Sequence, residues 1–442
     1  MRKFLLKILA ALALLLLGLS CGSNSQSGQP EYTLPDVPDE PIWQAQDVET
    51  LQLTIARETR HRIPHIREWY PPFYEVNPVF IEKEDDSYVL YGVHQWEPDF
   101  VDSIEDVDKD YGANRWVIGE DEIETNLFTG IEGEYPYVLG IDYPDNPGPE
   151  YCIIFTVRSD DAARRSIPEG RGLSLYQMDG SRIATVDVNA VNCDIINYLP
   201  IDYPGNEIFI VEVYDEDRKY QVYSFTEGGS MYTDSRAAAN YGLHWLSDTK
   251  EWFYCEERSV DDIERLDIIA EAQDGSVVRF EPWTWPEYSF GEGDHEIQDV
   301  IDVPPIFIDG HRHLMVYTAA ETSERKIDRW WLVRYDTGES ASPVWCRDEP
   351  YMPTANMRLF LIGEDERPFL VRYGEVSERL RIIDLVSGEC VINERIANAR
   401  FSSTGNRATL AYYVGENRRI PVVFIFDYEG GELIQIDLEI EE

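Results

Sequence analysis

The sequence predicts an all-β protein built as a β-propeller of four-stranded blades. Alternating apolar and polar residues run through most of the chain, and helical periodicity is scarce. The alternating stretches are joined in pairs by turns that contain glycine, and these turns recur about every 50 residues, a spacing typical of propeller blades. We expect seven blades, with six or eight as alternatives and a pair of β-sandwiches as the competing architecture.

The first 20 residues have the composition of an export signal. Basic residues precede an apolar run from Ile8 to Leu19, which is about half as long as a bilayer crossing needs. The run ends in Gly18-Leu19-Ser20-Cys21. This ending resembles the lipobox of bacterial lipoproteins, and the resemblance implies cleavage before Cys21 and a lipid on that cysteine. The lipobox prefers Leu, Val or Ile where this chain has Gly18, so cleavage without a lipid is the alternative.

Residues 21–41 are predicted to be the lipidated cysteine and a flexible tether. The segment is rich in Gly, Ser, Gln, Pro and acidic residues and has too few large apolar residues to pack. A flexible chain of this length reaches roughly 25 Å. We expect the propeller to occupy residues 42–442, with residues 42–100 forming either an N-terminal cap or the first blade.

Six segments join two alternating stretches through a glycine-containing turn, which is the pattern of a β-hairpin. Another strand-like stretch precedes most of them, as in Tyr151–Val157. Because a ring of blades must bury its two open edges, we expect the last strand, near Leu433–Leu438, to pair in a blade shared with or next to the N-terminal strands. The turn glycines are Gly180, Gly229, Gly275, Gly338, Gly388 and Gly431, with Gly130 as a candidate for a seventh.

The segment from Ala399 to Leu438 carries a more specific pattern. Residues 401–406 (FSSTGN) precede an apolar strand, and the next strand ends in Asp427 before a Gly-Gly turn. This arrangement resembles a blade of the TolB-like and WD-repeat-like propellers, although the Pro-Asp of that family's first turn is missing here. His244–Cys255 resembles the same blade more weakly. The resemblance implies a fold and no particular activity, because propellers serve as scaffolds, sensors and enzymes.

The charge of the chain limits its partners. It has 84 acidic and 38 basic residues, which gives a formal net charge of −46. Such a field repels phosphate backbones and anionic surfaces, so we expect no nucleic-acid partner. Five cysteines follow Cys21 with no CxxC pair and no zinc-like spacing, and we expect most of them to be buried thiols.

One acidic segment has the pattern of a calcium loop. Asp106, Asp108 and Asp110 alternate ahead of Gly112, and Asn114 follows. Oxygen ligands at alternate positions of a glycine-containing loop suit calcium. The spacing resembles the DxDxDG calcium loop, with the glycine one place late. The sequence therefore predicts calcium as a cofactor, with chance alternation in an acidic chain as the alternative.

Aromatic clusters indicate a second kind of site. Trp283 and Trp285 lie in WTWPEY, and Trp330 lies in RWWLVRY. Such rings stack on sugars, and packing between blades is the competing interpretation. Strand alternation is expected to place one of Trp330 and Trp331 in the core.

Together these observations favour a membrane-anchored, extracytoplasmic propeller lipoprotein at the cell membrane or outer membrane. We expect it to act as a binding or scaffold module for a protein or glycan. The alternatives are a glycan-active enzyme, either a glycosidase or a lyase, and a sensor or assembly subunit. The sequence has no GxSxG, HExxH, P-loop or GxGxxG motif, so it identifies no catalytic residue and does not favour an enzyme.

Overall fold

A computed structural model describes the strands of the chain and some of the turns that join them. Within these ranges, no helix has the length and apolar character needed to cross a membrane. The expected signal sequence and Cys21 lie outside them. The described residues are 37–64, 80–95, 111–127, 134–139, 151–158, 171–177, 179–188, 192–199, 207–214, 219–226, 229–237, 241–246, 251–260, 263–272, 276–279, 296–300, 306–319, 327–335, 342–350, 356–363, 365–374, 379–396, 409–414, 420–427 and 431–441.

These residues form seven antiparallel sheets, so the all-β prediction is confirmed. The first four sheets each take four strands in chain order. Sheet 1 contains β3 (Phe80–Glu84), β4 (Ser87–Gln95), β5 (Tyr111–Val117) and β6 (Glu124–Leu127). Sheet 2 contains β7 (Glu134–Leu139), β8 (Tyr151–Arg158), β9 (Arg171–Gln177) and β10 (Arg182–Val188). Sheet 3 contains β11 (Asn192–Leu199), β12 (Glu207–Tyr214), β13 (Lys219–Thr226) and β14 (Gly229–Ala237). Sheet 4 contains β15 (Tyr241–Leu246), β16 (Glu251–Val260), β17 (Ile263–Ala272) and β18 (Val277–Arg279).

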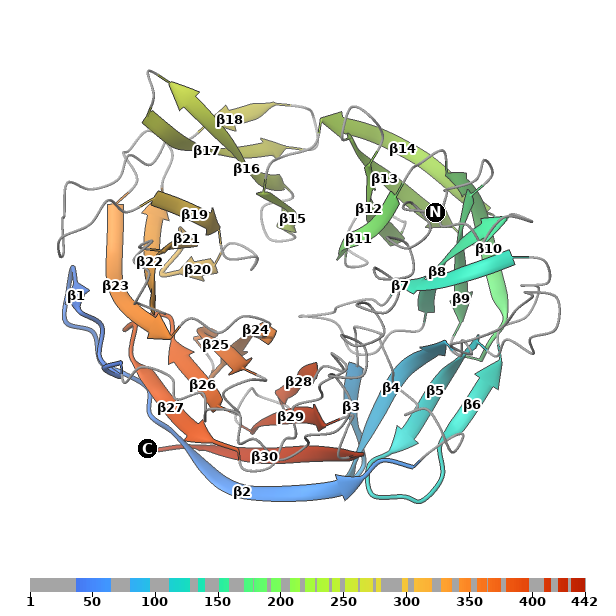
Figure 1. Cartoon of the computed structure of the whole chain (residues 1–442), viewed down its shortest axis with the longest axis horizontal. Coiled ribbons are helices and arrows are strands. Elements are labelled where there is room, and N and C mark those ends of the chain that lie inside the picture. The colour runs from blue at the N-terminus through green and yellow to red at the C-terminus, as the bar shows by residue number, and fades with distance from the viewer. Residues whose placement is uncertain are drawn as a thin grey trace, which may run out of the picture. The chain divides into compact units, whose positions relative to one another are not determined.

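Two of the last three sheets also take a strand from the N-terminal part of the chain. In Figure 1, blue β1 lies beside orange β23, and blue β2 lies beside red β30. Sheet 5 contains β19 (Glu296–Val300), β20 (Ile306–Ile308), β21 (His311–Ala319), β22 (Ile327–Tyr335), β23 (Ser342–Pro350) and β1 (Trp43–Gln44). Sheet 6 contains β24 (Asn356–Ile362), β25 (Arg367–Gly374), β26 (Arg379–Asp384) and β27 (Cys390–Arg395). Sheet 7 contains β28 (Thr409–Val414), β29 (Pro421–Asp427), β30 (Glu432–Ile440) and β2 (Leu53–Arg62).

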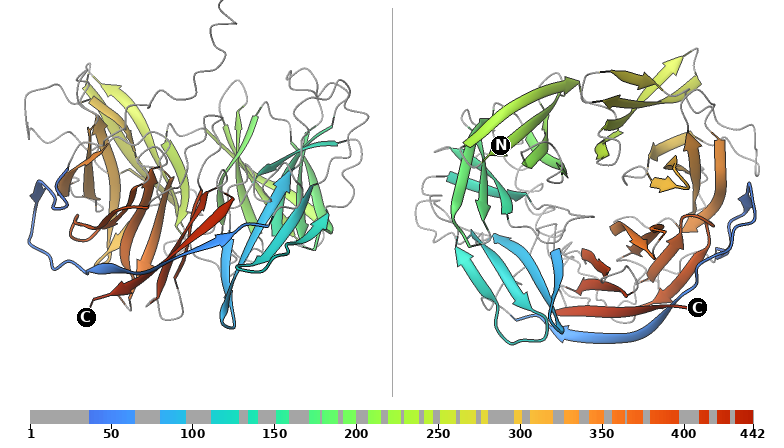
Figure 2. Two further views of the ribbon diagram at one scale, coloured as in Figure 1. Left: turned by 60° about the horizontal axis from the view of Figure 1, so that its bottom comes forward. Right: turned by 180° about the vertical axis from the view of Figure 1, so that it is seen from behind.

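The pairing of β2 with β30 confirms that the last strand joins an N-terminal strand. The two strands are antiparallel, from Leu53 opposite Ile440 to Arg62 opposite Glu432. Both views in Figure 2 show them side by side. Consecutive sheets also contact one another, through strand pairs such as β4 with β7, β24 with β28 and β28 with β3.

All six predicted hairpins are present, because the strands on either side of each turn pair antiparallel. The proposed seventh turn at Gly130 is wrong. The strand before it, β6, pairs with β5, and the strand after it, β7, pairs with β8, so the two belong to different sheets. The turn of that hairpin lies instead between β5 and β6, where Gly119 has a φ of +101°.

The expected division of the N-terminal region also requires correction. Residues 42–100 form neither a cap nor a single blade, since they supply strands to sheets 1, 5 and 7. The folded unit begins at Pro35, and Val37 is buried, so the tether ends before residue 41. Composition could not show this, because the segment is held mainly through its backbone.

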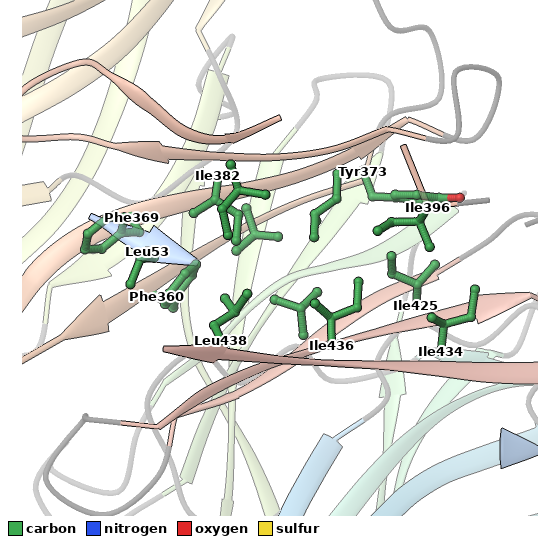
Figure 3. Close-up of a cluster of buried hydrophobic side chains, with 14 of the residues drawn as sticks. Leu53, Phe360, Phe369, Tyr373, Ile382, Ile396, Ile425, Ile434, Ile436 and Leu438 are labelled. Atoms are coloured by element: carbon green, nitrogen blue, oxygen red, sulfur yellow. The ribbon is translucent and has the colours of Figure 1, made fainter. Parts of the chain in front are cut away.

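Apolar side chains fill the space between sheets 6 and 7. Strand β25 is buried along almost its whole length, so its alternate residues face two different neighbours. Phe369, Val371 and Tyr373 pack toward sheet 7, whereas Leu370 packs with residues of sheet 5. Figure 3 shows the first of these clusters, which includes Leu53, Phe360, Phe369, Tyr373, Ile382, Ile396, Ile425, Ile434, Ile436 and Leu438.

Candidate functional site: a buried charge cluster beneath an N-terminal strap

Residues 37–52, which we call the strap, cross the outer strands of sheets 5 and 6 before the chain enters β2. The carbonyl of Asp39 accepts a hydrogen bond from the Cys390 amide at 2.8 Å. Trp43 lies opposite Cys346 in β23, and the Ala45 amide donates to the Val344 carbonyl at 2.8 Å. The strap is therefore bound to two sheets at once, largely through backbone groups.

Asp384, at the end of β26, holds the second half of the strap. It is fully buried and accepts a hydrogen bond from the Leu51 amide at 3.2 Å. The Arg367 guanidinium donates Nε to this carboxylate at 3.0 Å and also donates to the carbonyl of Glu49. The Ser387 hydroxyl donates to Asp384 at 3.1 Å, so one carboxylate joins the strap to the β26–β27 turn.

A second, larger group of charges lies between sheets 5 and 6. We call it the Glu349 cluster, and its members are Asp328, Arg347, Glu349, Arg372 and Arg381, which are at most 7% exposed. Glu349 is its centre. It accepts hydrogen bonds from Arg381 at 2.9 and 3.0 Å, from Arg347 at 2.8 Å and from Arg372 at 3.3 Å.

Strand register explains why these charges meet. In sheet 5, Asp328 lies opposite Glu349 and Trp330 lies opposite Arg347. Because residues two apart on a strand share a face, all four side chains lie on one side of the sheet. In sheet 6, Arg372 lies opposite Arg381, so these two also share a face. The two faces meet, with the guanidinium of Arg372 4.6 Å from the centre of the Trp330 ring.

The cluster sets the protonation of its two acids in opposite directions. Burial alone would raise the pKa of Glu349, but the charges of Arg347, Arg381 and Arg372 outweigh it and lower that pKa to about 2. Burial raises the pKa of Asp328 to about 6, because attraction to Arg372 is offset in part by repulsion from Glu349. Glu349 is thus a permanent anion, while Asp328 changes charge near neutral pH.

Arg347 connects the cluster to the strap. Its Nε is fixed by Glu349, and its Nη1 points to the carbonyl of Asp39 at 3.3 Å and to the carbonyl of Gly388. Gly388 lies in the β26–β27 turn with a φ of +77°. One guanidinium therefore joins sheet 5, a turn of sheet 6 and the strap.

The geometry suits a structural or conformational role. Every member of the cluster is at least nine-tenths buried, so its charges face other protein groups and not a dissolved substrate. Over the described ranges, no three His, Cys, Asp or Glu side chains are grouped as a metal site would need. Buried charges of this kind hold elements in fixed positions because an unpaired partner is costly.

Most residues expected to form sites lie outside the described ranges. They are Cys21, Asp106, Asp108, Asp110, Trp283 and Trp285, and the calcium and glycan sites built on them remain predictions. Asn114 lies within strand β5, and its side-chain oxygen accepts a hydrogen bond from the Thr125 hydroxyl at 2.8 Å. The end of the proposed calcium loop is therefore strand, because β5 already begins at Tyr111.

Trp330 is 2% exposed and its ring is covered by Arg372, so this position fits the core-packing interpretation and not sugar stacking. Trp331 is buried as well, so the expectation that one of the two tryptophans lies in the core understated the packing. Sheet 5 buries residues on both faces, Leu332 on one and Val333 on the other. Of the expected buried thiols, Cys346 and Cys390 are free and buried, and burial raises the pKa of Cys390 to about 11.

Sequence reasoning missed the Glu349 cluster. The available signal was charge within apolar strands: Arg372 interrupts FLVRY, Arg381 interrupts LRII, and Arg347 and Glu349 alternate in WCRDEP. Charged residues inside such strands are rarely fully buried unless they are paired. The sequence does not show which strands face each other, so the partners could not be assigned.

Comparison with known proteins identifies no family. No family model matches the chain, and no curated protein matches it. Among solved structures, it is similar to the WD40 domain of coronin from Toxoplasma gondii, with 12% identity, a TM-score of 0.44, and coverage of 89% of this chain and 90% of that one. It is also similar to TolB from Acinetobacter baumannii, with 12% identity, a TM-score of 0.30, and coverage of 78% and 79%. For the β-propeller domain of the Trilobed protease from Pyrococcus furiosus, the identity is 10%, the TM-score 0.37, and the coverage 78% and 91%. Similarity this low carries no argument about function.

Proposed function

We propose that this protein is a lipid-anchored, extracytoplasmic β-propeller that acts as a binding or scaffold module. In this proposal the seven sheets are seven blades. Two features support it: sheets 1 to 4 and sheet 6 are built from four strands in chain order, and the last sheet combines strands from both ends of the chain. A closed ring of blades needs such a sheet because it has no free edge to leave open.

The observation that carries the anchoring proposal is the attachment of the strap. The segment that follows the expected tether is bound to sheets 5 and 6 and continues into sheet 7. A lipid on Cys21 would therefore be joined to the folded body through three sheets and not through one frayed end. This arrangement suits a protein that works while held at a surface. The net charge of −46 favours cationic or neutral partners over anionic ones.

Replacing the proposed lipidated residue tests the anchor. Cys21→Ser should move the protein from the membrane fraction to the soluble fraction of fractionated cells, because the thiol that carries the lipid is lost. Mass spectrometry of the unmodified protein should show a mature N-terminus at Cys21 with added acyl chains. A mature terminus beyond residue 21 without acyl chains would contradict the proposal, and ordinary signal cleavage would then account for the first 20 residues.

A further inference from the structure

The two parts of the N-terminal region are held in different ways. Strand β2 pairs with β30 along its length, and Leu53 at its start is 2% exposed. The strap has one short strand, β1, of two residues, and most of its side chains are exposed. Ile42 and Val48 are 38% and 36% exposed, whereas Val37 is buried. Segments with little apolar burial open at lower free energy than core strands.

Polar contacts to a few charged side chains replace the missing apolar burial. Arg347 donates to the carbonyl of Asp39, Arg367 donates to that of Glu49, and Asp384 accepts from the amide of Leu51. Hydrogen bonds to charged groups are stronger than those between neutral groups, and they depend on how the charged group is oriented. For Arg347 that orientation is set by Glu349, which Arg381 and Arg372 hold in turn.

We propose that the strap is a releasable segment and that Arg347, positioned by Glu349, is its latch. In the released state residues 37–52 leave sheets 5 and 6, while β2 remains paired with β30. The latch is buried and the strap is exposed, so release removes contacts from the strap without dismantling the sheets beneath it.

Release would change the reach of the anchor, an inference that rests on the proposed function. About 16 residues lie between Cys21 and the strap, and release would lengthen this flexible chain to about 30. The root-mean-square reach would rise from about 22 Å to about 30 Å. The same protein would then have a short and a long tether, selected by the state of the strap.

Hydrogen–deuterium exchange of the full-length protein tests the strap without reference to lipid. In the unmodified protein, amides of residues 37–50 should exchange at least tenfold faster than those of residues 53–62, because the two segments open separately. Equal rates in the two segments would overturn the proposal. Since this measurement does not involve membranes, its failure is distinguishable from loss of anchoring in the Cys21→Ser variant.

Substitution of the latch gives the second arm. Arg347→Lys keeps the positive charge but cannot contact Glu349 and both carbonyls as a planar guanidinium does. It should accelerate exchange of residues 37–50 at least tenfold further and leave residues 53–62 and 421–440 protected. The matched control is Arg329→Lys, which alters an ion pair with Asp348 in the same sheet. Unchanged exchange in the strap would overturn the assignment of Arg347 as the latch.

Should Arg347→Lys fail to fold, a milder variant replaces it. Asn393 donates its side-chain amide to the Asp39 carboxylate at 3.0 Å and is partly exposed. Asn393→Ala should accelerate exchange of the strap alone, by a smaller factor. Equal acceleration in residues 37–50 and 53–62 would mean that the strap and β2 open together, which contradicts the proposal.

Discussion

At the scale of single residues, two glycines allow the fit between sheets 5 and 6 to be separated from backbone strain. Gly388 and Gly363 both have positive φ angles, of +77° and +83°. A Cβ on Gly388 would lie 2.8 Å from ring carbons of Trp345, whereas a Cβ on Gly363 would have nothing within 4 Å. The indole of Trp345 also donates to the Leu385 carbonyl at 2.8 Å, so its ring cannot move freely.

We predict that Gly388→Ala lowers the free energy of unfolding by about 2 to 4 kcal/mol, because backbone strain and overpacking add. Gly363→Ala should cost about 1 kcal/mol, from the strain alone. Urea denaturation of the two variants measures both values. Equal losses would show that the turn does not press against Trp345.

A second residue-scale prediction concerns Asp328. Its pKa is about 6 in the folded protein and close to the ordinary 3.8 when unfolded. Above pH 6 the residue is ionised in both states, and burial of its charge costs stability. As the pH falls through about 6, the folded state takes up the proton first, so the stability due to this group increases until about pH 4.

Asp328→Asn should remove that pH dependence and stabilise the protein at pH 8 by about 1 to 3 kcal/mol, the size of a shift of about two pKa units. The measurement is the difference in unfolding free energy between variant and parent from pH 4 to pH 8. Asp348→Asn is the control, since its partly exposed ion pair with Arg329 should contribute less than about 1 kcal/mol. A difference that does not vary with pH would contradict the assignment.

At the scale of elements, sheet 7 is completed by a strand from the other end of the chain. Deleting residues 420–442 removes β29 and β30, and β2 loses its partner. We predict loss of cooperative thermal unfolding, or a melting temperature lower by more than 10 °C. Deleting residues 37–44 should cost much less, because β2 and β30 stay paired. A C-terminal truncation that keeps the full melting temperature would argue against a closed arrangement of sheets.

The element scale also shows what could be predicted from the sequence. The hairpins were predictable because a turn glycine and its flanking alternation are local. Gly130 failed because a glycine between two strands does not say whether they pair. Residues 42–100 failed because Trp43 and Leu53 find their partners about 300 and 390 residues away. Nothing in a local pattern encodes a partner at that distance.

At the scale of the whole molecule, the acidic surface and the buried cluster follow different rules. The sequence predicts the charge of −46 directly, since composition alone fixes it. It does not predict that three arginines gather around Glu349 inside the protein, because this depends on sheets 5 and 6 facing each other. The general architecture was therefore accessible from periodicity, and the candidate site was not.

The partnership of β2 with β30 has a consequence for how the chain is made. Arg57 and Asp437, which bond across these strands, are 380 residues apart. At about 5 to 20 residues per second, translation leaves β2 waiting roughly 20 to 80 seconds for its partner. An unpaired strand can meanwhile bind the wrong neighbour. The charged side chains of Arg57, Glu58, Arg60 and Arg62 discourage such pairing, so the sequence of β2 suits a nascent segment that must stay single until synthesis is nearly complete.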